Sequence, residues 1–293
     1  MNDPPQRPWQ TVALVLGFAF LYTPIVWIIY FSFSGDLPSG GNGGSGGSHF
    51  SLHWYRALLA NRELGAAAYR SLVLALLSSP IAALLGSLAG IGLARLDAFP
   101  GRSVMIALLA IPIFAPEILL GFSFLMLFAS AQALTGWSHG KGMLTLVIAH
   151  ATLGAPIVAS VVFARVSGRD RSLEDAARDL GARPLRVLMT VTVPLAAPGI
   201  LSGWLLALTL SFDDVVTSSF LAGPENTTLP MAIFSGLRVG LDPQINAVGT
   251  LMVVGVTAIV AISFAATRIG VLASGWRRAS PSGWRKALLS GEA

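Results

Sequence analysis

DAARDLGARPLRVLMTVTVP, residues Asp175 to Pro194, is a polar stretch between two apolar segments that are each long enough to cross a lipid bilayer. The chain around it has 293 residues, of which 54% are hydrophobic and only 11% are charged. An average soluble domain has roughly 25% charged residues, so this composition, with a mean hydropathy of +0.71, indicates a membrane protein. The absence of cysteine excludes disulfides, thiolate catalysis and cysteine-bound metals.

Six apolar segments approach the roughly 20 residues that a membrane-spanning helix needs. They lie at about Thr11–Phe33, Ser71–Ala94, Ser103–Phe128, Met143–Ala164, Leu195–Val216 and Ile245–Thr267. We therefore expect an all-α membrane protein with six transmembrane helices. The first segment is too long for a removable signal peptide, and no small-residue cleavage pattern follows it closely, so it should remain as a membrane anchor.

The distribution of positive charge predicts the orientation of these spans. The sequence pI of about 10.2 would suit a nucleic-acid partner, but no basic face with interleaved aromatic residues appears. With six spans, only five of the 19 Lys and Arg residues fall on one side of the membrane: Arg56, Arg62, Arg70, Lys141 and Arg238. Since cytoplasmic loops carry the excess of positive charge, both termini and the polar stretch should be cytoplasmic.

The first outer loop contains SGDLPSGGNGGSGGS, residues Ser34–Ser48, whose Gly and Ser content predicts a flexible spacer. A coil of this composition cannot bury a hydrophobic core. The sequence after it has apolar residues at helical spacing, Trp54, Leu58 and Leu59, and predicts a short outer helix ahead of the second span.

The polar stretch and the residues just before it divide into two short helices. Ser172 can cap the first helix with Asp175 at its third position, the S-x-x-acid arrangement of a capping box. One face of that helix is apolar, comprising Leu173, Ala176, Ala177 and Leu180. Gly181 should end the helix in a left-handed conformation, and Pro184 should begin the second helix where no N–H is needed. A helix with two alanines on its apolar face can sink closely into a groove, so we interpret this elbow as a docking element.

The spacing of this stretch resembles the signature of the inner-membrane permeases of binding-protein-dependent ABC importers. Those permeases carry Glu-Ala-Ala, three residues, Gly, nine residues, and then Ile, any residue, Leu and Pro. Here the intervals are matched by Asp175, Ala176, Ala177, Gly181, Val191, Val193 and Pro194. The acid and the two branched aliphatic residues are conservative departures, and Glu174 stands beside the acid position as an alternative acid. The resemblance covers about residues 60 to 270.

This resemblance implies the six-helix permease fold, with residues 1–10 and 271–293 as cytoplasmic tails and 11–270 as the transmembrane domain. Residues 172–184 would form the coupling helix, which fits a cleft on an ATPase subunit. The residues assigned to that contact are Glu174, Asp175, Ala176, Ala177, Gly181 and Pro194. The alternative is that the elbow is only a solvated amphipathic turn.

The chain has no phosphate-binding loop of its own. Such a loop needs Gly-Lys followed by Ser or Thr, and neither Lys141 nor Lys286, the two lysines, has that context. We therefore expect no enzymatic activity and no cofactor in this chain, with ATP and Mg bound by the partner ATPase.

Three acidic residues lie inside the apolar segments, where a charged side chain costs roughly 2.5 to 3.5 kcal/mol on insertion scales. Asp213 and Asp214 lie toward the outer half of the fifth span, and Glu117 lies within the third. Such groups usually face a cavity or a partner, and adjacent carboxylates favour a cation. The alternatives are a helix end that reaches interfacial water, for the aspartates, and a protonated or Arg-paired side chain, for Glu117.

Pro112 and Pro116 should break the third span around Glu117, since each removes a backbone donor and clashes with the preceding turn. An opened turn beside an acid is a common way to build a site at membrane depth. The alternative is a simple kink.

Other side chains near this path are weaker candidates. Trp54, Trp204 and Phe212 could present aromatic faces to a cation, although lipid or core packing is the plainer role for an aromatic residue in a span. Ser211 could add a hydroxyl, although bonding within its own helix is its plainer role. His150, in the fourth span, is interpreted as an interhelical hydrogen-bonding residue rather than a proton relay. His53 lies four residues after His49, but no further metal ligand is nearby, so no metal site is predicted.

The stretch from Ser211 to Thr250 resembles spermidine/putrescine importer permeases, in particular the second of their two permease chains. Those permeases carry Ser, a bulky apolar residue and two aspartates here, and an acid after proline in the third span. The substrate path that this resemblance implies comprises Trp54, Glu117, Ser211, Asp213 and Asp214.

The partners that this resemblance implies are a sister permease, an ABC ATPase dimer and a periplasmic polyamine-binding protein, at a bacterial inner membrane. Two alternatives stay open. One is a proton-coupled secondary transporter of organic cations, and the other is an ABC permease for phosphonates, opines or ferric iron.

Overall fold

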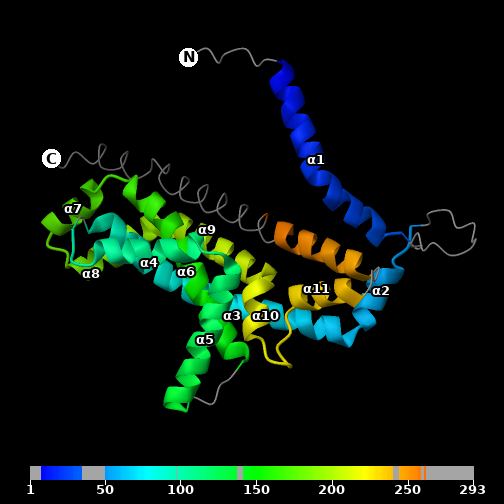
Figure 1. Cartoon of the computed structure of the whole chain (residues 1–293). Helices are drawn as coiled ribbons and strands as arrows, with labels where there is room; N and C mark the ends of the chain where they lie inside the picture. Colours follow the sequence, from blue (N-terminus) through cyan, green and yellow to red (C-terminus); the bar gives the residue numbers. More distant parts are fainter. Residues whose placement is uncertain are drawn as a thin grey trace, which may run out of the picture. The chain divides into compact units, whose positions relative to one another are not determined.

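The computed structural model describes residues 8–34, 50–96, 98–136, 141–239, 244–258 and 261. Within these ranges the chain is helical apart from short connections and one isolated bridge between Ser34 and Phe50 (Figure 1). Most of the predicted N-terminal tail, nearly all of the Gly/Ser-rich segment and the basic C-terminal tail lie outside the described residues.

The helices are α1 (Pro8–Ser32), α2 (His53–Ala60), α3 (Arg62–Arg95), α4 (Arg102–Phe114), α5 (Glu117–Thr135), α6 (Met143–Ser167), α7 (Ser172–Asp179), α8 (Pro184–Val187), the π-helix η1 (Leu188–Thr192), α9 (Val193–Asp213), α10 (Val216–Leu221) and α11 (Leu229–Val239). A further helix, Gln244–Ala258, follows them. The chain divides into two compact units at Leu251, inside this last helix, and the helices α1 to α11 belong to the first unit.

Five of the described helices are long and apolar enough to cross a membrane: α1, α3, α5, α6 and the helical run Pro184–Asp213. Helix α4 and the helix Gln244–Ala258 are apolar but shorter. The predicted all-α membrane class is confirmed, and the segments follow the six-span layout with one change. The third predicted span is divided into two helices, α4 and the first part of α5.

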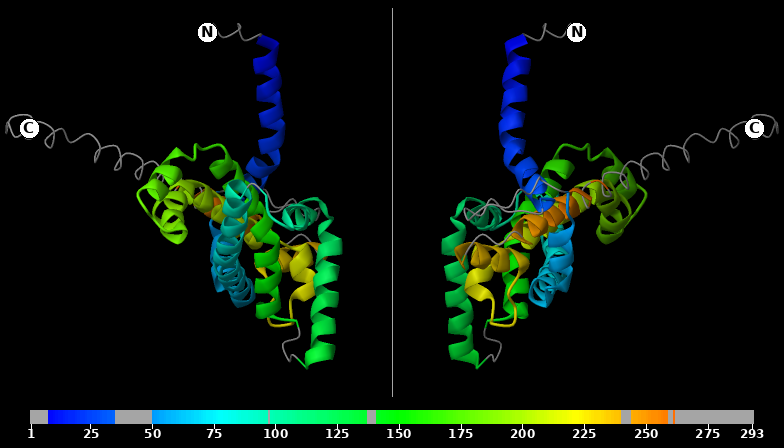
Figure 2. Two further views of the ribbon diagram at one scale, coloured as in Figure 1. Left: turned by 90° about the vertical axis from the view of Figure 1, so that its left-hand side faces the viewer. Right: turned by 90° about the vertical axis from the view of Figure 1, so that its right-hand side faces the viewer.

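Helices α3, α6 and α9 pack together and form the core (Figures 1 and 2). The buried side chains between them are small or branched, including Ala82, Val158, Val162 and Ala207. A glycine brings two of the helices very close, since a Cβ added to Gly90 in α3 would lie 2.6 Å from the carbonyl oxygen of Ala159 in α6. Because lipid tails are as apolar as these side chains, close backbone packing of this kind is what holds membrane helices together.

Two breaks interrupt the apolar helices. Between α4 and α5, Ala115 is extended (φ −74°, ψ 142°) because it precedes Pro116, which disfavours a helical conformation. The predicted break around Glu117 is therefore confirmed. Between α9 and α10, Asp214 leaves the helical conformation (φ −65°, ψ 126°), so the fifth span ends at Asp213, close to its predicted end at about Val216.

Helix α1 stands largely apart from the other helices, and its most apolar stretch contains no buried side chain (Figure 1). Its end is fastened to the predicted outer helix, α2, where Trp54 Nε1 donates to the Ser34 carbonyl (2.8 Å) and Tyr55 Oη hydrogen-bonds Ser32 Oγ (2.8 Å). Helix α3 begins earlier than expected, because Asn61 Oδ1 accepts the first free N–H groups of the helix.

The elbow consists of α7, a turn at Gly181 and α8. Gly181 has φ 80°, so the predicted left-handed residue is confirmed, and Pro184 begins α8 as expected. The capping box at Ser172 is wrong, because Ser172 is already helical and donates its backbone N–H to Asp170 Oδ1 (3.1 Å). Hydrogen bonds from Ser172 lower the pKa of the Asp170 carboxyl below its ordinary value. After α8 the chain makes one π-helical turn, η1, before α9.

Candidate functional site

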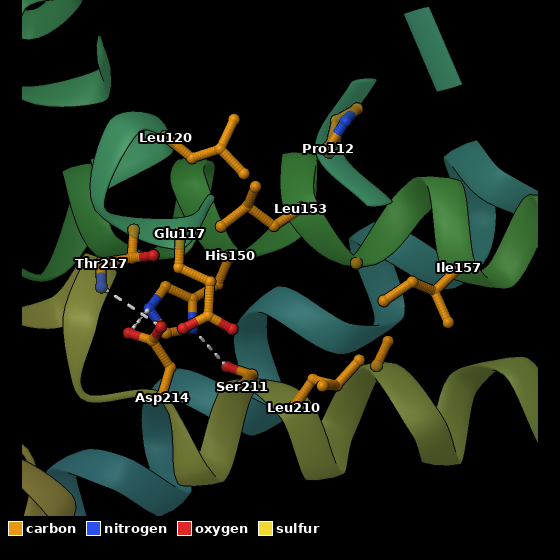
Figure 3. A pocket seen from close by; sticks show the side chains of 12 residues that line it. Pro112, Glu117, Leu120, His150, Leu153, Ile157, Leu210, Ser211, Asp214 and Thr217 are labelled. Carbon is orange, nitrogen blue, oxygen red and sulfur yellow. Dashed lines mark hydrogen bonds and ion pairs between the residues drawn. The ribbon is translucent and has the colours of Figure 1, made fainter. Parts of the chain in front are cut away.

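A pocket of about 100 Å³ lies among α5, α6, α9 and α10, beside both helix breaks (Figure 3). The side chains that bring polar atoms to its wall are Glu117, His150, Ser211, Asp214 and Thr217. The remaining lining is apolar, and includes Leu120, Leu153 and Leu210. The structure thus brings together three of the five residues predicted for the substrate path, namely Glu117, Ser211 and Asp214.

Asp214 lies at the junction of α9 and α10, and its carboxylate caps α10. Oδ1 accepts the backbone N–H of Thr217 (3.2 Å) and Oδ2 accepts that of Ser218 (2.7 Å). These N–H groups have no partner within the helix, and the helix dipole favours a negative charge at that end. Asp214 is therefore at a helix end and also lines the pocket.

Glu117 is the first residue of α5, directly after the break at Pro116. In Figure 3 its carboxyl group points toward the same space as Asp214, from the other wall of the pocket. A first-turn position stabilises a negative side chain for the same reason as at α10. Each acid thus sits at the start of a helix that a break has created, which offsets part of the cost of placing it at membrane depth.

His150 of α6 connects these elements. Its Nδ1 lies 2.9 Å from Ser211 Oγ of α9, and its Nε2 lies 3.3 Å from Ser218 Oγ of α10. Ser211 Oγ is also 2.9 Å from Ser78 Oγ of α3, and all four side chains are buried. The interpretation of His150 as an interhelical hydrogen-bonding residue is confirmed. For Ser211 the plainer role proposed from sequence, bonding within its own helix, is wrong.

Two residues predicted for the path lie elsewhere. Asp213 is exposed and is not part of the pocket wall, because it is still in the last turn of α9 while Asp214 has turned inward. Trp54 lies in α2, half-buried against Ser34, and does not line the pocket either. The sequence shows that Asp213 and Asp214 are adjacent, but it does not show that the helix ends between them. The hydrogen bond of Ser78 to Ser211 was not predicted, because in the sequence Ser78 is only one serine within an apolar segment.

The elbow presents an exposed apolar surface. Leu173 and Leu180 of α7 and its turn are 59% and 89% exposed, and Leu185 of α8 is 66% exposed. Ala176 is exposed beside them. Three exposed leucines are thus gathered on the elbow.

The two acids of the elbow have different positions. Asp175 is exposed and pairs with Arg178 on the same helix (2.7 Å). Glu174 is buried and pairs with Arg95 of α3 (Nε to Oε1, 2.9 Å). The sequence-based suggestion that Glu174 substitutes for the exposed acid is therefore wrong, because its carboxylate faces the protein interior.

An acid-lined pocket inside a bundle of spanning helices can hold a small cation, and an exposed elbow can receive a partner. The fold and the site together define a membrane transport permease. The model of the family described as "Binding-protein-dependent transport system inner membrane component" matches residues 82–274, and the chain belongs to this family.

Relatives of known function agree with this assignment. The chain is 41% identical to the putrescine transport system permease protein PotI of Escherichia coli K12, over 89% of this chain and 92% of that protein. It is 36% identical to the spermidine/putrescine transport system permease protein PotC of Haemophilus influenzae, over 86% of this chain and 93% of that protein.

Solved structures share the fold at low sequence identity. A bacterial ABC transporter involved in the import of the acidic polysaccharide alginate superposes with a TM-score of 0.67 at 16% identity, covering 90% of this chain and 96% of that chain. The MetNI methionine ABC transporter superposes with a TM-score of 0.59 at 18% identity, covering 70% and 95%. The cargo named for these two proteins differs, so the fold by itself does not select a substrate.

Proposed function

We propose that this chain is a permease subunit of an ATP-driven importer that moves polyamines or related organic cations across a bacterial inner membrane. The observation that carries this proposal is the pair of acids, Glu117 and Asp214, that line one pocket among spanning helices. The putrescine and spermidine named for the relatives PotI and PotC are linear amines, which suit such a pocket.

The physical argument rests on dehydration. An ammonium group that enters the membrane loses water, and a carboxylate at 4 Å returns about 4 kcal/mol at an effective dielectric near 20, before desolvation is subtracted. Glu117 and Asp214 both face this pocket, so a linear amine could place an ammonium group against them as it passes.

The partners proposed are a sister permease, an ABC ATPase dimer and a periplasmic substrate-binding protein. The exposed apolar surface of the elbow supports an ATPase contact through Asp175, Ala176, Ala177 and Gly181. Since the sequence lacks a Gly-Lys-Ser/Thr loop, ATP and Mg would bind only to that partner. The exposed length of α1 supports a contact with the sister permease.

The proposed orientation places both termini and the elbow in the cytoplasm. The chain contains no cysteine, so single cysteines can be introduced at Gly44 and Ala293 without a background signal. A membrane-impermeant maleimide added to spheroplasts should label Gly44→Cys and spare Ala293→Cys until the membrane is permeabilised. Equal labelling of both positions in intact spheroplasts would contradict this orientation.

The deciding experiment is uptake by the reconstituted complex in proteoliposomes, with labelled putrescine, spermidine, a neutral amino acid and a phosphonate. We expect ATP-dependent uptake of the amines alone, unaffected by a protonophore. Uptake driven by a proton gradient without ATP would indicate a secondary transporter. Uptake of the phosphonate in place of the amines would contradict the proposal that Glu117 and Asp214 bind a cationic substrate.

A further inference from the structure

Glu174 has the lowest exposure of the acidic side chains in the described part of the chain, at 2%. Its Oε1 accepts hydrogen bonds from Arg95 Nε and from Thr192 Oγ1, both at 2.9 Å. These residues come from three elements: α7 of the elbow, the last turn of α3, and η1 at the base of α9. We call the set Glu174, Arg95 and Thr192 the elbow joint.

Further contacts fasten the same place. Arg95 Nη1 donates to the Arg169 carbonyl (3.4 Å), and Arg171 Nη2 donates to the Ala94 carbonyl (3.2 Å) at the end of α3. The last carbonyls of a helix have no partner within it, and cations near them complement the helix dipole. The segment that leads into α7 is therefore attached to the end of α3 by both side-chain and backbone groups.

The two long helices that end at the elbow joint also meet at the pocket. Ser78 of α3 and Ser211 of α9 hydrogen-bond each other (2.9 Å), and Ser211 bonds His150. Ser78 lies 17 residues before Arg95, and Ser211 lies 19 residues after Thr192. At 1.5 Å per residue, each helix spans roughly 25 to 29 Å between the two polar clusters.

The packing between the clusters leaves little room for the helices to deform separately. A Cβ added to Gly90 of α3 would meet the Ala159 carbonyl of α6 at 2.6 Å, and one added to Gly203 of α9 would meet Val158 of α6 at 3.0 Å. Close-packed interiors shift between discrete arrangements rather than bending continuously. The elbow joint and the pocket are therefore connected by two tightly packed helices, α3 and α9.

We propose that Glu174 is a positioning residue for energy coupling, and that the elbow joint passes movement of the elbow to the walls of the pocket through α3 and α9. This inference rests on the proposed function, because the movement would be supplied by the ATPase docked on the elbow. Asp175, on the exposed face of α7, would contact the ATPase. Glu174, on the buried face, would bind α7 to α3 and α9, so that these two helices move with the elbow.

The test measures the amine transported per ATP hydrolysed by the purified, reconstituted complex. Thr192→Val removes one hydrogen bond to Glu174 at nearly constant volume, and Thr192→Ser keeps it. Glu174→Gln removes the negative charge that pairs with Arg95. We expect Thr192→Val and Glu174→Gln to lower the transport-to-ATP ratio by about fivefold or more, the lower end of ordinary coupling energies, with ATP hydrolysis and subunit assembly retained.

Thr192→Ser should stay near the wild-type ratio, as should the matched control Glu63→Gln, which makes the same change at an exposed position in the first turn of α3. If the Glu174→Gln complex fails to assemble, the inference is tested by comparing the transport-to-ATP ratios of Thr192→Val and Thr192→Ser. An unchanged ratio in Thr192→Val and in any assembled Glu174→Gln complex, with wild-type transport established, overturns this inference alone. Absence of ATP-dependent uptake in the wild-type complex would instead overturn the proposed function.

Discussion

His150 Nε2 lies 3.6 Å from Asp214 Oδ2, while that same carboxylate oxygen accepts the backbone N–H of Ser218 at 2.7 Å. Among the described residues, the basic side chain found within 4 Å of the Asp214 carboxylate is thus this buried histidine and not an Arg or Lys. Both carboxylate oxygens of Asp214 are thus held at the start of α10, beside the pocket. The geometry therefore separates Asp214, which is aimed at the pocket, from its neighbour Asp213.

The first prediction concerns the acids of the pocket. Asp214→Asn and Glu117→Gln should each lower amine uptake by about tenfold or more, since 1.4 kcal/mol corresponds to one decade and the attraction lost is larger before desolvation. Asn keeps one oxygen to cap α10, so the fold should be retained. The measurement is initial uptake at equal amounts of reconstituted complex.

Asp213→Asn is the matched control, because it makes the same change at the next position, which is exposed and outside the pocket wall. Its effect on uptake should be clearly smaller than that of Asp214→Asn. If all three substitutions were silent, singly and together, with wild-type uptake demonstrated, the acids would be structural only.

The second prediction concerns the buried hydrogen bonds of Ser211. Ser211→Ala removes the bonds to Ser78 and His150, and interhelical hydrogen bonds in membranes contribute roughly 0.6 to 2 kcal/mol each. The purified protein should therefore unfold at a lower temperature in detergent. Ser202→Ala, on the same helix, removes only a bond to the carbonyl of Pro198 at an exposed position and should leave the melting temperature unchanged. Equal melting temperatures for both variants would contradict the proposed contribution.

The third prediction concerns the packing of α3 on α6. A Cβ at Gly90 would lie 2.6 Å from the Ala159 carbonyl, so Gly90→Ala must push the helices apart, and overpacking typically costs about 1–3 kcal/mol. Gly92, two residues on, has nothing within 4 Å of its Cβ position, and alanine there should be neutral or slightly stabilising. Thermal unfolding of the two variants distinguishes them, and a Gly90→Ala protein as stable as Gly92→Ala would show that this contact is looser than described.

Much of this architecture follows from the sequence because it depends on local chemistry. The composition decides the membrane class, Pro116 decides the break before Glu117, and Gly181 followed by Pro184 decides the elbow. The break and the elbow depend on backbone conformations that only a few residue types can adopt. The signature spacing around Gly181 likewise pointed to the family.

The parts that the sequence did not reveal depend on contacts between distant segments. Asp213 and Asp214 look equivalent in the sequence, and only the end of α9 between them leaves Asp213 exposed and places Asp214 on the pocket wall. Glu174 and Asp175 differ in the same way, because Arg95, 79 residues away from Glu174, lies on one side of α7. Pairings of this kind come from tertiary packing and have no local pattern.

The last prediction concerns the turn of the elbow. Gly181 has φ 80°, and a Cβ there would have nothing within 4 Å, so a substitution acts through backbone strain and not through a clash. An L-residue in this conformation costs roughly 1–2 kcal/mol, more for a β-branched side chain, while Asn tolerates it best. Gly181→Val should therefore shift the angle between α7 and α8, and ATPase co-purification and uptake should fall together although the chain still inserts.

Gly181→Asn should retain most of both activities, which ties the effect to the left-handed conformation. The matched control is Gly168→Ala at the end of α6, where φ is −78° and the added Cβ would make only an ordinary contact of 3.7 Å with the Ala164 carbonyl. That variant should bind the ATPase and transport amines like the wild type. A surface that fits a cleft on a partner depends on the angle between its two short helices. If Gly181→Val also bound the ATPase and transported amines like the wild type, that angle would not matter, and the proposed ATPase contact at this turn would be wrong.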